Sequence, residues 1–509
     1  MVLEGIMTGL STAFTFTNIL MVCLGVFAGT FIGMLPGLGP ISAIALMIPI
    51  TYGFEPSSGL ILMAGVYYGA VFGGSTSSIL LNAPGVAGTV ATSFDGYPLA
   101  QGGKAGKALA TAAYSSFSGG TIGAIFLLLA APALAVVSLS FQSADYFALM
   151  VMGLTAVSAF TGKGQFLKAA LMTILGVMLS TVGTDDSTGI PRFTLGQLDL
   201  IDGISFLLLA MATFALSEAL ISALKPGETS NAAQTTVAER FGSLKVSKQE
   251  FKEIAPSIGR SSVLGFFIGV LPGAGATIAS FLAYGMEQAF AKGKAKLQFG
   301  KGSLKGLAAP ETANNAASTG SFVPLLTLGI PGSGTTAVML GALISYGVQP
   351  GPRLFAERPD VFWSVIVSMY LGNIVLLILN LPLIPYIARL LAVPKPFLVP
   401  FVLFFSLIGV YLVSFNNFDI YLMVGFAACA LFFRLLDFPM APMLLGFVLG
   451  GLLEENLRRA LLINDGDLSF LWTRPITLVI LIITAAVLFL PLYRSLTEKF
   501  RERPWLMVK

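Results

Sequence analysis

The dominant pattern along this chain is a series of apolar stretches separated by shorter polar or charged ones. Most stretches have roughly the 17–25 residues that a helix needs to cross a bilayer. The pattern therefore predicts an all-α chain that crosses the membrane many times. The stretches are residues 17–35, 41–50, 59–83, 108–137, 146–160, 166–183, 203–224, 262–285, 311–330, 335–348, 361–387, 397–415, 420–433, 439–453 and 475–493.

Two apolar regions are interrupted by a Pro-Gly-x-Gly sequence, one beginning at Pro36 and the other at Pro272. Proline removes a backbone donor and ends a helix, and glycine allows the chain to turn with a positive φ. We expect the pieces flanking each break to be too short to span a bilayer alone. The pattern thus predicts broken helices, with re-entrant hairpins that turn inside the membrane.

The two interrupted regions are copies of one another. Residues 31–46 read FIGMLPGLGPISAIAL and residues 267–282 read FIGVLPGAGATIASFL, with nine of sixteen positions identical at a constant offset of 236. A second Pro-Gly element follows each copy, LNAPGVAGT at 81–89 and LGIPGSGTT at 328–336. Such repetition indicates an internal duplication, with two breaks in the same order in each half.

The loop charges predict an orientation. The stretches 225–260 and 286–310 and the C-terminal tail are rich in Lys and Arg, whereas 184–202 has four Asp and one Arg. Lys and Arg accumulate in cytoplasmic loops, so we place the first three inside and the last outside. Only the 262–285 stretch separates the two basic loops, so it must enter and leave on one face.

Five crossings between the two copies make the halves inverted, the arrangement typical of secondary transporters. The resulting division is a first membrane repeat at 1–224, a cytoplasmic linker at 225–260, a second membrane repeat at 261–460, and a last membrane helix with a basic cytoplasmic tail at 461–509.

Composition supports a membrane protein and excludes several chemistries. Charged residues are 11% of the chain, against about 25% in soluble proteins, and the mean hydropathy is +0.86. The chain has no His and only two Cys, which removes His-based catalysis and a disulfide or Cys metal framework. A net charge of +4 without aromatic residues beside basic patches argues against nucleic-acid binding. An intramembrane enzyme and a channel-like scaffold remain as alternatives to a transporter.

The breaks are the candidate anion site. A break frees N–H groups at the start of the next helix, and these partly positive ends bind anions. The membrane stretches contain almost no Lys or Arg, so an anionic substrate must be held by backbone amides, hydroxyls and side-chain amides. The candidate substrate-binding residues are Gly37, Gly39, Asn82, Gly85, Gly88, Thr89, Gly273, Gly275, Asn315, Gly332, Ser333, Gly334, Thr335 and Thr336.

One acidic residue, Glu311, opens a membrane stretch. Two interpretations stand: a carboxylate favoured by the helix dipole at a helix start, or a cation-coupling residue beside the neighbouring Asn pair. Glu311 and Asn314 are therefore candidates for ion coupling, with Na⁺ or H⁺ as the ion and no other metal or cofactor. Asp95, in the sequence FDGYP, is expected to be a turn residue.

The motifs resemble those of the large membrane subunit of the tripartite tricarboxylate transporters, the TctA type. The matching sequences are GMLPGLGP at 33–40, SSILLNAPG at 77–85, FDGYP at 94–98, GVLPGAGAT at 269–277, AAPETANNA at 308–316, LGIPGSGTT at 328–336, FPMAP at 438–442 and ENLRRAL at 455–461. Together they extend over almost the whole chain.

This resemblance implies a bacterial inner-membrane secondary transporter with about twelve membrane segments. It implies two protein partners, a small four-helix membrane subunit and a periplasmic solute-binding protein that delivers the substrate. The expected substrates are di- and tricarboxylates, citrate among them, moved by alternating access. The expected energy source is an ion gradient and not ATP.

Overall fold

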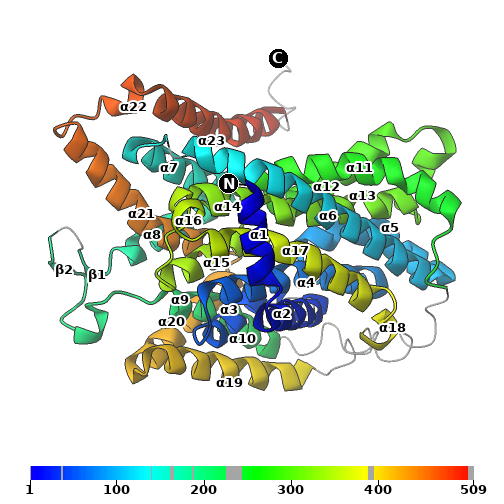
Figure 1. The fold of residues 1–509 in the computed structure, drawn as a ribbon, viewed down its shortest axis with the longest axis horizontal. Coiled ribbons are helices and arrows are strands. Elements are labelled where there is room, and N and C mark those ends of the chain that lie inside the picture. The colour runs from blue at the N-terminus through cyan, green and yellow to red at the C-terminus, as the bar shows by residue number, and fades with distance from the viewer. Residues whose placement is uncertain are drawn as a thin grey trace, which may run out of the picture. The chain divides into compact units, whose positions relative to one another are not determined.

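The computed structural model describes residues 2–35, 38–138, 140–160, 165–185, 188–224, 243–387 and 395–501. The described chain is almost entirely helical (Figure 1), and its one pair of strands is the short antiparallel hairpin β1 (Gly183–Thr184) and β2 (Pro191–Arg192). Six helices are long and apolar enough to cross a bilayer, and several shorter apolar helices accompany them. The prediction of an all-α, multi-pass membrane chain is confirmed, and the count of about twelve crossings stays a prediction.

The chain folds into two compact units, and each unit takes residues from both halves of the sequence. Unit 1 comprises Met1–Ser138 and Ile204–Leu436. Its helices are α1 (Val2–Ala13), α2 (Phe16–Met34), α3 (Gly39–Thr51), α4 (Pro56–Leu81), η1 (Ala87–Thr89), α5 (Val90–Leu99), η2 (Ala100–Lys104), α6 (Ala105–Ser138), α9 (Phe206–Ala210), η4 (Met211–Leu216), α10 (Ser217–Leu224), α11 (Lys248–Val270), α12 (Gly275–Phe290), η5 (Gly293–Gln298), α13 (Leu304–Gly320), α14 (Phe322–Leu328), α15 (Gly334–Ser345), α16 (Pro352–Glu357), α17 (Pro359–Asn380), α18 (Ile384–Ile387), α19 (Lys395–Ser414) and α20 (Asn417–Leu435).

Unit 2 comprises Leu139–Gly203 and Asp437–Lys509. It contains α7 (Ser143–Phe160), α8 (Phe166–Ser180), the β1–β2 hairpin, η3 (Leu198–Leu200), α21 (Ala441–Ile463), α22 (Phe470–Thr473) and α23 (Pro475–Arg501). Helices α8 and α21 pack closely, because the carbonyl of Met443 lies where a side chain at Gly176 would begin. Arg458 bridges the buried Asp185 at 2.7 Å, which ties the connection after α8 to α21.

Glycines show that the duplication extends to the packing of helices. In each half, two glycines on the helix before the break let it lie directly against the backbone of a second helix, a common way for membrane helices to associate. The glycines repeat at an offset of 236 and their partners at 247, so eleven extra residues separate the two helices in the second half. The contacts join Gly29 to Val66 and Gly33 to Ala70 between α2 and α4, and Gly265 to Ala313 and Gly269 to Ala317 between α11 and α13.

The backbone at the breaks is also duplicated. Leu35 and Leu271, which follow α2 and α11, are both extended, with ψ of 113° and 123°. Gly39 and Gly275, which begin the next helices, have φ of 61° and 62°. This left-handed conformation is easily adopted only by residues without a Cβ. The glycine of each Pro-Gly-x-Gly sequence that opens the following helix is therefore required by the backbone.

One expectation about the breaks is wrong. The pieces on both sides were expected to be too short to span, yet α2 has 19 residues and is long and apolar enough to cross a bilayer. Its counterpart α11 has 23 residues. Only the helices after the breaks are short, with 13 residues in α3 and 16 in α12. Polar residues at the start of α11 had concealed its full length, because they extend the helix beyond the apolar stretch.

Replacing Gly269 with alanine should lower the unfolding temperature markedly. The added Cβ would overlap the carbonyl oxygen of Ala317, and such overpacking costs about 1–3 kcal/mol. Gly285→Ala on α12 is the matched control, since nothing lies within 4 Å of its added Cβ. Alanine is a better helix former than glycine, so the control should be neutral or slightly stabilising. Thermal unfolding of both variants in detergent checks this, and equal effects would contradict the close packing of α11 on α13.

The start of α11 predicts a pH-dependent contribution to stability. Lys107 on α6 lies 2.5 Å from Glu250, which also completes a capping box with Ser247. The hydrogen bond from Lys107, followed by those from Ser247, lowers the pKa of Glu250 from 4.5 to about 2. Because the pKa is lowered in the folded state, the pair stabilises the protein above about pH 4.5 and loses this contribution as the pH falls towards 2.

Lys107→Met should therefore lower the unfolding temperature at about pH 6, and the difference from wild type should shrink as the pH falls towards 3. The pair is partly exposed, with side chains 30% and 24% accessible, so the effect should stay below about 1 kcal/mol and weaken in salt. Lys252→Met removes an exposed lysine from the same region and serves as the control. A difference that stayed constant between the two pH values would contradict the pairing.

Candidate functional site

Three of the four breaks lie together in unit 1. The amide N–H of Gly273 donates to the carbonyl of Gly332 at 3.1 Å, which joins the second Pro-Gly-x-Gly turn to the second Pro-Gly element. On its other side, a Cβ at Gly88 would lie 3.3 Å from the Cβ of Ala276. The start of α12 thus contacts both the Gly88 loop of the first half and the Gly332 loop of the second.

The first Pro-Gly-x-Gly break lies beside its own Pro-Gly element. A Cβ at Gly85 would overlap the carbonyl oxygen of Gly33, the glycine just before that break. Gly39 begins α3 and has open space around its Cα. Gly37, another candidate from this break, lies outside the described residues.

Two reciprocal contacts connect the halves at this place. The hydroxyl of Tyr67 on α4 lies 3.4 Å from the hydroxyl of Ser333 in the second half. The amide nitrogen of Asn314 on α13 donates to the carbonyl of Gly88 in the first half at 3.3 Å. Tyr67 and Asn314 are 247 residues apart, the offset at which these helices repeat. Each half therefore extends an equivalent side chain to the Pro-Gly element of the other.

The Pro-Gly elements repeat one hydroxyl contact as well. The hydroxyl of Thr89 donates to the carbonyl of Val86 at 2.9 Å, and that of Thr336 donates to the carbonyl of Ser333 at 3.0 Å. Thr89 and Thr336 are again 247 residues apart. The side chains of Ser333 and Thr336 also cap the start of α15, each accepting from the backbone N–H of the other. The capping fixes the direction in which α15 leaves the break.

Several helix starts consequently meet at these breaks. Helix α12 begins at Gly275, α15 begins at Gly334, and α5 follows the short η1 turn at Thr89. The first turn of each helix has N–H groups without partners inside the helix, and this end carries a partial positive charge. Gly275, Ser333 and Gly334 are partly exposed, so these starts are open to a ligand. The arrangement can hold an anion with backbone donors.

The remaining candidates have different positions. Asn82 ends α4 in a left-handed conformation, with φ of 51°, and its side chain is exposed. The amide nitrogen of Asn315 donates to the carbonyl of Glu311 at 2.9 Å and to the side-chain oxygen of Asn314 at 2.7 Å. Both donors of this amide are thereby used within α13. Asn315 orients Asn314, and Thr335 is buried behind the start of α15.

A buried carboxylate lies close to this region. Glu311 is fully buried in the middle of α13, seven residues after the helix begins at Leu304, so its interpretation as a carboxylate at a helix start is wrong. The hydroxyls of Ser75 on α4 and Ser116 on α6 both donate to its Oε2 at 2.7 Å. The hydroxyl of Thr92 on α5 donates to its Oε1. Three helices thus supply one donor each, and no ion pair involves Glu311 in the described part of the chain.

Sequence reasoning found only part of this carboxylate site. Ser75 was a plausible hydroxyl because it lies on the helix before a Pro-Gly element, but Thr92 and Ser116 were missed. Nothing in the local sequence distinguishes them from the many other hydroxyls of membrane helices. They come near Glu311 only because α5 and α6 pack beside α13.

The expectation for Asp95 is also wrong. Asp95 lies within α5 and is fully buried. Its Oδ1 accepts the backbone N–H groups of Gly302 and Ser303, at 2.8 Å and 2.7 Å. These residues immediately precede α13, where a negative charge interacts favourably with the helix dipole. The turn-like composition around Asp95 was misleading because its partners lie more than 200 residues away.

Comparison with known proteins decides the family. A sequence profile described as "Tripartite tricarboxylate transporter TctA family" matches residues 19–445. The chain belongs to the TctA family. It is similar to "Uncharacterized 52.8 kDa protein in TAR-I ttuC' 3'region" of Agrobacterium vitis, with 42% identity over 491 residues, 96% of each chain. It is also similar to "Uncharacterized protein in TAR-II ttuC' 3'region" of the same organism, with 43% identity over 235 residues, 46% of this chain and 96% of that protein. No solved structure matches it.

Membership gives the site its setting. TctA proteins form a transporter family, so this chain is a multi-pass membrane subunit of a tripartite tricarboxylate transport system. The profile extends from α2 into α21 and thus includes all four breaks, Asn314 and Glu311. The breaks of this TctA chain are therefore features of its transport unit.

Proposed function

We propose that this TctA chain is the subunit that moves di- or tricarboxylates across the bacterial inner membrane, driven by an ion gradient. A periplasmic solute-binding protein delivers the substrate, and a small four-helix membrane subunit completes the complex. The observation that carries the proposal is the meeting of breaks from both halves in unit 1, where Asn314 reaches Gly88 and Tyr67 reaches Ser333. The substrate binds at this meeting point.

The chemistry of the breaks suits a carboxylate that must also leave. A buried anion without donors is prohibitively costly, and the breaks supply donors without a fixed positive charge. Each helix start contributes about 0.3–1 kcal/mol when exposed and up to about 2 kcal/mol when partly buried. Several starts together can offset the loss of hydration, while each interaction stays weak enough to be broken. A lysine or arginine at the same place would hold the anion more tightly and slow its release.

The duplicated architecture suits alternating access. We propose that the two halves are inverted repeats with about twelve crossings in total, and that the breaks lie near the middle of the bilayer. The equivalent positions of Tyr67 and Asn314, and of Thr89 and Thr336, support a pseudo-two-fold relation between the halves. Such a pair of halves has two mirror-related states, one open to each side of the membrane.

Uptake by reconstituted protein tests this function. The full-length chain, its small membrane subunit and its binding protein are combined in proteoliposomes, and labelled di- and tricarboxylates are added with or without a Na⁺ or pH gradient. The expected result is saturable, concentrative uptake of at least one carboxylate that needs the gradient and the binding protein. Robust high-affinity uptake by the chain alone would contradict delivery, and non-saturable flux without a gradient would indicate a channel-like pore.

Labelling of an introduced cysteine tests the orientation. Lys296→Cys, placed in η5 of a variant without Cys23 and Cys429, should react with an impermeant thiol reagent only after the inner membrane is opened. The reason is that the Lys-rich stretch around it is predicted to be cytoplasmic. Thr194→Cys, in the acidic 184–202 stretch, is the control and should react in intact spheroplasts. Labelling of residue 296 from outside would contradict the re-entrant arrangement of α11 and α12.

A further inference from the structure

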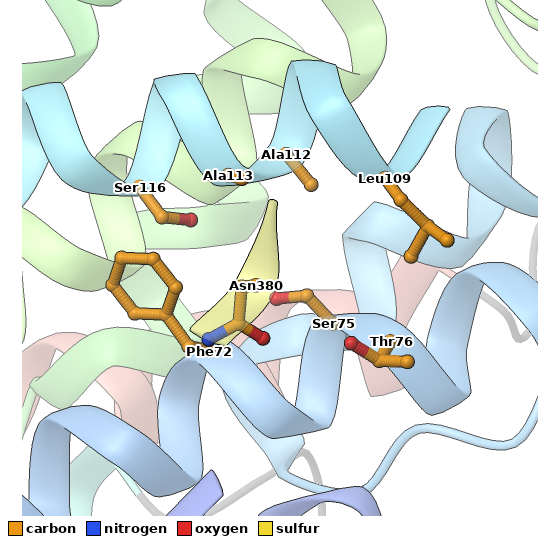
Figure 2. Close-up of a pocket in the computed structure, with 8 residues that line it drawn as sticks. All are labelled: Phe72, Ser75, Thr76, Leu109, Ala112, Ala113, Ser116 and Asn380. Carbon is orange, nitrogen blue, oxygen red and sulfur yellow. The ribbon is translucent and has the colours of Figure 1, made fainter. Parts of the chain in front are cut away.

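A small enclosed cavity lies between α4, α6 and α17 (Figure 2). The centre of a water molecule can occupy about 10 Å³ of it, which is close to the least volume that holds one water. Four polar side chains, Ser75, Thr76, Ser116 and Asn380, line it together with apolar residues. The cavity thus offers oxygen atoms around a space of the size of a single small ion.

The cavity adjoins the buried carboxylate. Ser75 and Ser116, which line the cavity, are also the residues that donate to Oε2 of Glu311 at 2.7 Å. A hydroxyl that donates its hydrogen to a carboxylate keeps its lone pairs free for another partner. These lone pairs and Oε2 give the region a negative potential that no cation balances in the described part of the chain.

Asn380 supplies an independent indication of a missing ligand. Its side chain is 5% exposed, and its nitrogen donates to the carbonyl of Leu376 at 3.0 Å. Its Oδ1 has no hydrogen-bond partner among the residues that the structure describes. Figure 2 shows this amide directed towards Ser75 and Thr76 inside the cavity. A buried acceptor without a donor is unfavourable, so something electropositive is expected beside it.

We propose that this cavity binds one Na⁺, with Glu311 supplying the charge and Ser75, Ser116 and Asn380 supplying neutral oxygen ligands. Hard cations prefer such oxygen ligands. A single carboxylate balances one positive charge, so a divalent ion would leave a net charge buried. A proton on Glu311 would neutralise the carboxylate but leave Oδ1 of Asn380 unpaired. The larger K⁺ fits poorly in a space for one water.

The site is connected to the proposed anion site by direct contacts. Glu311 accepts from Asn315 through its carbonyl, Asn315 donates to Asn314, and Asn314 donates to the carbonyl of Gly88 at the break. Ser75 and Ser116 come from the first half, whereas Glu311 and Asn380 come from the second, so the ion joins the halves. That this Na⁺ is the coupling ion rests on the proposed transport function, but the binding site rests on geometry alone.

Thermal unfolding of the purified full-length chain tests Na⁺ binding without substrate. NaCl is exchanged for choline chloride or KCl at constant ionic strength and pH. We expect a saturable rise in the unfolding temperature with Na⁺ and not with K⁺. Glu311→Gln should abolish this rise, and Asn380→Leu should raise the Na⁺ concentration for half the effect at least tenfold. Asn373→Leu, a buried asparagine two turns earlier on α17 and outside the cavity lining, should respond as wild type does.

The site is overturned if wild type does not respond to Na⁺, or if either cavity variant responds as wild type does. It is also overturned if stabilisation through Glu311 follows pH and not Na⁺, which would assign a proton. Because no carboxylate is present, the result is separate from transport. Na⁺ stabilisation without carboxylate uptake would reject the transport function alone, and uptake without Na⁺ stabilisation would reject the cation site alone.

Discussion

Glu311→Gln should reduce gradient-driven carboxylate uptake by at least about 100-fold, which corresponds to about 2.7 kcal/mol of lost interaction. The glutamine keeps the size of the side chain and can still accept from Ser75 and Thr92, so the fold should persist. It removes the only negative charge of the proposed cation site. A buried carboxylate without a cation also repels an approaching anionic substrate, so ion binding and substrate binding are favoured together.

The measurement is initial uptake into proteoliposomes with and without an imposed Na⁺ gradient. Glu357→Gln makes the same change of net charge at an exposed position on α16 and should transport normally. If the Glu311 variant still accumulated carboxylate against its gradient, Glu311 would not couple the ion to transport.

Gly88→Val should abolish uptake while leaving the protein folded in the membrane. Gly88 lies where the first Pro-Gly element meets the second half, with Ala276 and Asn314 next to its Cα. A valine there would separate the break from α12 and displace the Asn314 amide from the Gly88 carbonyl. The strain of adding a few carbons to a packed site is about 1–3 kcal/mol, which a protein of this size can tolerate. A misplaced binding geometry need not be tolerated by transport.

Ala87→Val is the matched control, because it adds similar bulk at the neighbouring residue, whose side chain is exposed. We expect near-normal uptake for this control and at least a tenfold loss for Gly88→Val, with both proteins present in the membrane in equal amounts. Equal uptake by the two variants would show that the meeting of the breaks does not matter for transport.

The sequence predicted the elements that depend on local chemistry. The Pro-Gly breaks at Pro36 and Pro272 and the second elements at Pro84 and Pro331 follow from residue types that cannot continue a helix. Their repetition predicted which parts of the fold are equivalent, and the packing of Gly33 and Gly269 follows the same repeat. The class of the fold and the family were therefore predictable from composition, pattern and motif.

The sequence could not predict which distant residues meet. Glu311 has its donors on α4, α5 and α6, about 200 residues earlier, and Asp95 binds backbone groups before α13. Such pairings are determined by how helices pack, which leaves no local signature. For the same reason the division into two compact units, each taken from both halves, was not visible. Membrane stretches were segmented by hydropathy, so the full length of α11 was missed as well.

A structure of the complete complex with a transported carboxylate bound tests the central claim most directly. We expect the carboxylate groups to contact the backbone amides at the starts of α12 and α15 and in the 85–89 segment, beside Ser333 and Asn314. A substrate bound instead against the Lys-rich 286–310 stretch, or at a place that none of the four breaks reaches, would contradict the account.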